Sequence, residues 1–276
     1  MATVRLFVPL LALLLLGPGC SKSSDGGGNN NGPSGYLTIN APSDVIKCGA
    51  CQPFTATYTK GGVSQTVAPT WSTNNPAVAT IDGSGQLTPL THGDVNVTAR
   101  YEDATATKPI HVVNDYGAVW SGQYVITRCE ASAGAAWEGF CDAEGFFVSR
   151  ALPIDLEFQQ ERYAVTGTVW LGSVQSTFTG TVNTGGELTG ESKGSISFED
   201  GVVDVLVSPF RVVRQAERIP DGSFTATMTL SGYAGRGTFD ARVMGLDKYT
   251  GGRTAIRKAT RPPRTLRDVW QMVRER

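Results

Sequence analysis

The feature that most constrains the fold is the absence of helical periodicity over most of the chain. Between Tyr36 and Leu246, apolar residues alternate with polar ones in short runs instead of recurring every three or four positions. Turn sequences such as Asn75-Pro76 and Asp221-Gly222 separate these runs. Strands with one apolar face must bury those faces against each other, so the sequence predicts an all-β protein.

The style of alternation changes near residue 115, which predicts two domains, 36–113 and 116–246. A chain of 276 residues has room for two cores. The formal net charge of −1 gives no bias toward nucleic acid, so we expect no nucleic-acid partner.

Residues 1–20 have the anatomy of a signal peptide. Arg5 precedes an apolar run from Leu6 to Leu16, and small residues lead to Cys20. The run of eleven residues is about half of the ~20 needed to cross a bilayer, so it predicts export and not a transmembrane anchor.

Cys20 and the small residues before it resemble the lipobox of bacterial lipoproteins. The departures from that motif are Gly17, where Leu is usual, and Pro18. The resemblance implies lipidation of Cys20 and a cell-envelope location, lipid-anchored to a bacterial membrane, the outer one where the organism has one. The alternative is an ordinary secretory signal. Residues 21–35, rich in Gly, Asn and Ser, then form a tether.

Four further cysteines form two close pairs in the sequence, which predicts disulfides Cys48–Cys51 and Cys129–Cys141 in an exported chain. A redox role for Cys48-Gly-Ala-Cys51 is the weaker alternative, because the flanking residues favour strands over a helix N-terminus. We predict no metal site, since the four thiols lie in two domains.

Residues 36–113 resemble the bacterial immunoglobulin-like domain, group 2. The residues that carry this likeness occur in the family's order and spacing: Trp71-Ser72, Asn75-Pro76, Val78-Ala79, Ile81-Asp82, Gly85, Leu87, Gly93 and Val97-Thr98-Ala99. The resemblance implies a β-sandwich. It fits a spacer that extends another domain, or a module for adhesion at a surface.

Residues 116–246 predict eight or nine strands with one apolar face each. In one of them Ile154, Leu156 and Phe158 alternate with acidic residues. Closing such strands into an up-and-down antiparallel barrel buries every apolar face and removes the exposed edges. The opening 120–124, WSGQY, resembles the first strand of lipocalin-like and avidin-like barrels. An outer-membrane pore needs strands of about 9–11 residues and aromatic girdles, and the runs in this sequence are shorter and lack the girdles.

The apolar faces predict the lining of the barrel and a small apolar ligand as one possible occupant. Gly167 and Gly180 at inward positions favour some open space. The alternative is a filled barrel in a structural or adhesive surface protein. The predicted lining residues are Phe158, Tyr163, Val165, Phe178, Ile196, Phe198, Phe224, Met228 and Phe239.

The tail, 247–276, is basic and contains one predicted helix. From residue 251 onward it carries eight basic and two acidic residues, a net charge of +6. Leu266, Val269, Trp270 and Val273 recur at helical spacing after a possible capping box at Thr265. Residues 261–276 could contact anionic lipid or a protein partner, or form a solvated tail.

No sequence pattern indicates catalysis. Gly-x-Ser-x-Gly, Walker and dinucleotide-binding motifs are absent from the sequence. The neighbouring carboxylates Glu199 and Asp200 lie in a turn sequence, where solvation explains them. We therefore predict a protein that is not an enzyme and needs no cofactor; the weakest alternative is a hydrolase whose site the spacing of residues does not reveal.

Overall fold

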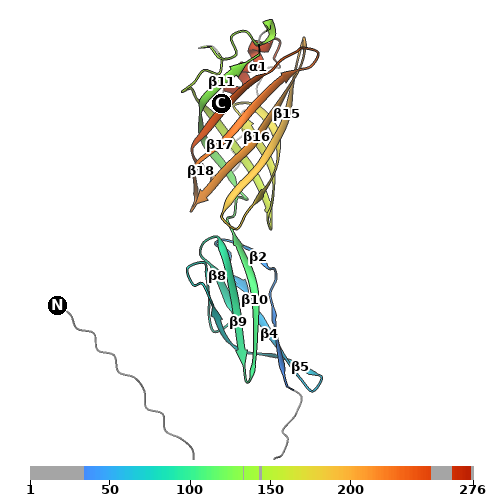
Figure 1. Ribbon diagram of the computed structural model, residues 1–276, viewed down its shortest axis with the longest axis vertical. Helices are drawn as coiled ribbons and strands as arrows, with labels where there is room; N and C mark the ends of the chain where they lie inside the picture. Colours follow the sequence, from blue (N-terminus) through green and yellow to red (C-terminus); the bar gives the residue numbers. More distant parts are fainter. Residues whose placement is uncertain (1–33, 133, 143–144, 250–262, 275–276) are drawn as a thin grey trace, which may run out of the picture.

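The computed structural model describes residues 34–132, 134–142, 145–249 and 263–274. The predicted signal peptide, Cys20 and nearly all of the tether lie outside these ranges. Figure 1 shows two β domains stacked end to end along the longest axis of the molecule. The all-β prediction is confirmed, with a sandwich, a closed barrel and a short C-terminal helix.

The first domain is a small sandwich built from three sheets. Their strand orders are β1-β4-β5, β2-β10-β9-β6 and β3-β8-β7, and β2 runs parallel to β10. The strands are β1 (Tyr36–Asn40), β2 (Val45–Lys47), β3 (Gln52–Pro53), β4 (Thr55–Lys60), β5 (Val63–Val67), β6 (Thr70–Thr73), β7 (Ala79–Ile81), β8 (Gln86–Pro89), β9 (Gly93–Tyr101) and β10 (Ala104–Val113).

The sandwich core agrees with the sequence pattern in most places. Val95 and Val97 point inward and are buried, as alternation after Gly93 predicts. The Asp82 carboxylate accepts hydrogen bonds from the Ser84 hydroxyl and backbone in the tight turn before β8, which lowers its pKa. Trp71 is only half-buried and meets the fully buried ring of Phe54 edge-on, with centroids 6.5 Å apart. Phe54 and Trp71 therefore pack together at the edge of the sandwich core.

The second domain is a closed barrel of eight strands in which each pairs with the next and β18 returns to β11. All its pairings are antiparallel. The strands are 8 to 15 residues long, longer than the sequence suggested. They are β11 (Val119–Ala131), β12 (Ala151–Glu161), β13 (Ala164–Leu171), β14 (Val174–Val182), β15 (Glu187–Phe198), β16 (Gly201–Gln215), β17 (Arg218–Leu230) and β18 (Gly237–Lys248), with a 3-10 turn η1 (Ala135–Trp137) between β11 and β12.

The helix α1 (Leu266–Arg274) lies at the end of the barrel far from the sandwich (Figure 1). The capping box forms: the Asp268 carboxylate accepts from the backbone N–H of Thr265, and the Thr265 hydroxyl accepts from that of Asp268. Val269, Trp270 and Val273 are buried against the barrel. A contact of the tail with anionic lipid or a protein stays a prediction, and the buried residues Val269, Trp270 and Val273 are not available for it.

Candidate functional site

The predicted lining of the barrel points inward at most positions, and its rings pack against one another. Phe158 lies 4.6 Å from Phe178, which lies 5.5 Å from Phe210, between ring centroids. Phe210 then contacts Phe224 at 6.1 Å, and Phe224 contacts Phe239 at 6.3 Å. These contacts form a continuous line of aromatic rings across the barrel interior. Val165, Ile196 and Met228 are also buried in the same core.

The glycines expected to leave open space do not do so. A Cβ atom on Gly180 would lie 2.7 Å from Cζ of Phe178, and one on Gly190 would lie 2.5 Å from the same atom. The two glycines face each other on β14 and β15, and the ring of Phe178 occupies the space above them. At Gly167 an added Cβ would lie 2.0 Å from the backbone oxygen of Glu157. Gly180 and Gly190 thus leave room for the ring of Phe178, and Gly167 allows β12 and β13 to lie close together.

Two predicted lining residues lie elsewhere. Tyr163 lies in the two-residue turn, 162–163, that connects β12 to β13, and therefore does not belong to either strand. Its ring lies 6.4 Å from that of His111 in the sandwich. Phe198 is the last residue of β15 and is only half-buried at the rim. Both side chains pack against the edge of the barrel core and are only partly buried, so they lie at its ends and not among the packed rings of the interior.

The segment between β11 and β12 closes the far end of the barrel, which the sequence did not indicate. Phe146 stacks on Phe239 with centroids 5.1 Å apart, and Phe140 lies 4.8 Å from Phe146. Phe140 also meets Trp270 of α1 edge-on at 5.6 Å. The inserted segment and the helix therefore pack together over one end of the core.

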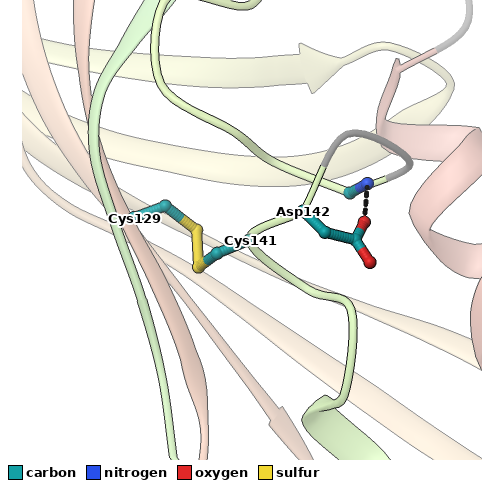
Figure 2. Close-up of a disulfide and its surroundings, with 4 residues drawn as sticks. Cys129, Cys141 and Asp142 are labelled. Atoms are coloured by element: carbon teal, nitrogen blue, oxygen red, sulfur yellow. Dashed lines mark hydrogen bonds between the residues drawn. A yellow bond between two sulfur atoms is a disulfide. The ribbon is translucent and has the colours of Figure 1, made fainter.

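The predicted disulfide Cys129–Cys141 is confirmed and ties this segment to β11. Figure 2 shows the bond, with a Cα–Cα distance of 5.7 Å. Next to it the Asp142 carboxylate accepts a hydrogen bond of 3.0 Å from the backbone N–H of Gly145. The bridge therefore restrains the segment at the point where its aromatic residues enter the core.

The predicted disulfide Cys48–Cys51 is wrong in the structure, where both cysteines are free. Cys48 follows β2 and Cys51 precedes β3, and these strands belong to different sheets. The Cys48 thiol points to the Asn114 side chain, with Sγ and Oδ1 3.9 Å apart, whereas Sγ of Cys51 lies 3.6 Å from the Thr88 hydroxyl. Burial raises the pKa of Cys48.

The short connection between the domains is anchored by buried hydrogen bonds. The hydroxyl of Tyr116 lies 2.8 Å from the carbonyl of Gly186 and 3.0 Å from that of Val212, and it accepts from the backbone N–H of Arg214 at 2.8 Å. Asn114 donates through Nδ2 to the carbonyl oxygen of Gly186 at 2.9 Å. These contacts hold the connection under the near end of the barrel.

Side chains on both sides add to this junction. Arg214 is largely buried, donates to the Asp115 carbonyl at 2.7 Å, and lies over the ring of Trp120. One ion pair joins the two domains, Arg162–Asp44 at 2.7 Å, and another joins the sandwich to the connection, Lys47–Asp115 at 3.2 Å. Exposed pairs of this kind contribute little stability, so the buried hydrogen bonds dominate.

The outer surface of the barrel is hollowed by a groove of about 660 Å³ over β16, β17 and β18. Arg211, Ser223, Arg242, Asp221 and Asp240 contribute to its lining. At one side lies Pro209, beside a break in the β16–β17 register that follows Val207. Alternation of apolar residues locates only the inward faces of strands, so the sequence pattern did not indicate this groove.

The geometry defines an immunoglobulin-like sandwich joined to a closed eight-stranded antiparallel barrel. Residues 37–112 match the family model of the bacterial Ig-like domain (group 2), which confirms the resemblance for that segment. No curated protein matches the chain. Across the ranges that the structure describes, no helix is long and apolar enough to span a membrane, and no three His, Cys, Asp or Glu side chains gather as metal ligands.

Proposed function

We propose that this protein is a non-enzymatic lipoprotein of the bacterial cell envelope, with a structural or adhesive role. Lipid on Cys20 attaches it to a membrane, the sandwich acts as a spacer, and the barrel is the displayed module. The observation that carries this proposal is the line of packed rings from Phe158 to Phe239. A barrel filled in this way presents its outer surface instead of an interior pocket.

The junction supports the role of the sandwich as a spacer. A spacer that must hold a second domain at a distance works best when the connection does not bend freely. Here Tyr116 and Asn114 are both buried and hydrogen-bonded to backbone carbonyls of the barrel. The two domains are also stacked end to end (Figure 1), which places the far end of the barrel well away from the start of β1.

Fractionation of cells that express the full-length chain tests the anchor. We expect the wild-type protein in the membrane fraction, with mass spectrometry showing an acylated mature N-terminus at Cys20. Cys20→Ser should leave that fraction, whereas Cys51→Ser, which changes another cysteine that is exposed, should not. Equal membrane association of Cys20→Ser and the wild type would contradict the proposed anchor.

Display of the barrel is tested separately with intact cells. A small reagent that does not cross membranes should modify Lys193, which is exposed on β15, if the barrel faces the outside of the cell. Labelling only after the cells are broken would restrict the role to a structural one inside the envelope. Removal of the barrel, residues 116–276, should abolish attachment of the cells to a surface if the role is adhesive.

A further inference from the structure

The outer groove of the barrel has short side chains along its middle strand and two arginines that form no ion pair with any residue that the structure describes. We infer that it binds an acidic sugar, with the acid group held between Arg211 and Arg242. This inference goes beyond the structural or adhesive role, and it does not depend on the lipid anchor. It rests on the register of three strands and on the ion pairs that the described arginines do or do not form.

The floor of the groove follows from the side chains of its middle strand. On β17 the outward residues Ser223 and Thr225 are short, whereas the neighbouring strands carry longer ones. Ser223 is directly opposite Arg211 on β16 and directly opposite Arg242 on β18. Directly opposite Cβ atoms in such ladders are about 5 Å apart, so both guanidinium groups can reach one group bound above Ser223.

Arg211 and Arg242 differ from most other arginines of the described barrel in having no ion-pair partner. Within the barrel, Arg128, Arg162, Arg214 and Arg218 each form an ion pair with a carboxylate. Neither Arg211 nor Arg242 takes part in any ion pair with a residue that the structure describes, although both line the same groove. Two guanidinium groups that flank a serine hydroxyl form a donor set that suits a carboxylate or phosphate group.

Arg211, Ser223 and Arg242 form one row across β16, β17 and β18, and carboxylates in the two neighbouring rows narrow the class of ligand. Asp221 lies one row nearer the sandwich, and Asp240, whose carboxylate accepts from the Thr225 hydroxyl at 2.7 Å, lies one row farther away. Glu187 is the third acidic residue of the lining. These groups would repel a ligand with many negative charges, but as acceptors they suit hydroxyl donors. A single acid group surrounded by hydroxyls is the chemistry of a uronic acid or a sugar phosphate.

Calorimetric titration of the purified full-length chain with glucuronate tests this inference. We expect saturable binding that Arg211→Gln and Arg242→Gln each weaken by about tenfold or more, since each removes a charged donor. Arg236→Gln is the matched control, because Arg236 is exposed in the β17–β18 hairpin and outside the groove. It should bind as the wild type does, and all three variants should have the same melting temperature as the wild type.

Glucose and inorganic phosphate separate the two parts of the recognition. Glucose lacks the acid group and should not bind, whereas phosphate lacks the sugar hydroxyls and should bind more weakly than glucuronate. Glucose 6-phosphate should bind like glucuronate if either acid group fits. Absence of saturable binding by both acidic sugars, or undiminished binding in both glutamine variants, would overturn the inference. Phosphate binding as tight as glucuronate binding would refute the part assigned to the carboxylates.

Discussion

The substitution Tyr116→Phe removes one hydroxyl from the junction and leaves the ring in place. That hydroxyl is fully buried, accepts from the N–H of Arg214 at 2.8 Å, and lies 2.8 Å from the Gly186 carbonyl oxygen. Asn114 still donates to the same carbonyl in the variant. The main loss is therefore the acceptor for Arg214.

A buried polar group left without its partner costs about 1–3 kcal/mol, and we expect Tyr116→Phe to lower the free energy of unfolding by that amount. Urea unfolding followed by tryptophan fluorescence measures it, because Trp120 contacts Tyr116. Tyr233→Phe is the matched control, since Tyr233 is exposed in the β17–β18 hairpin. Equal stability of the two variants would refute the role of the Tyr116 hydroxyl in holding the junction.

The same hydroxyl predicts a dependence of stability on pH. Burial raises the pKa of Tyr116 from 10.0 to about 12, so folding favours the protonated phenol. This contribution is complete below pH 10, where the unfolded phenol also keeps its proton, and it is lost as the pH rises from 10 toward 12. Tyr124, whose pKa burial also raises, adds to this decline. Tyr116→Phe should therefore lose stability less steeply over this range than the wild type does.

Three further predictions concern the far end of the barrel and the free thiols. Replacing both Cys129 and Cys141 by Ser should lower the free energy of unfolding by about 3 kcal/mol, which is the loop-entropy value for this span. Equal denaturation midpoints of the wild-type protein with and without reductant would contradict this. Trp270→Ala should weaken the docking of α1 on the barrel by about 3 kcal/mol and speed trypsin cleavage at Arg267. An unchanged cleavage rate would show that Trp270 does not hold the helix. Cys51 should react with iodoacetamide faster than Cys48, because Cys48 is half-buried and its pKa is raised. A Cys48–Cys51 disulfide in a non-reducing peptide map would refute this prediction.

The strands and their inward faces could be predicted from the sequence because alternation is a local property. Phe158, Phe178, Phe224 and Phe239 are buried where the period of two places them. The capping box before α1 is also local, since Thr265 and Asp268 are three residues apart. Each of these features depends only on nearby residues and on one geometric rule.

The features that were missed depend on breaks in that rule or on distant partners. Phe210 is a core residue, but the register shift between Val207 and Phe210 changes the side on which the alternation places it. Cys48 and Cys51 are close in sequence, but they lead into strands of different sheets. The Tyr116 hydroxyl finds its partners about seventy to a hundred residues away, which no local pattern could indicate.

Whether the barrel is filled or open is best tested at Phe178, the ring that covers the glycines of β14 and β15. This side chain is fully buried and lies 4.6 Å and 5.5 Å from the rings of Phe158 and Phe210. Truncation of a packed ring leaves a cavity, so Phe178→Ala should cost about 3–5 kcal/mol. Leu206→Ala, on the outer face of β16, is the control and should cost far less.

Benzene distinguishes the two kinds of interior directly. An apolar cavity created by truncation stays dry and can take up benzene, and a ligand that binds only the folded state raises its stability. Benzene should therefore raise the melting temperature of Phe178→Ala and leave that of the wild type unchanged, because the wild-type ring already occupies the space. A wild-type protein stabilised by benzene as strongly as the variant would mean that the interior is open. The apolar-ligand hypothesis would then replace the filled barrel.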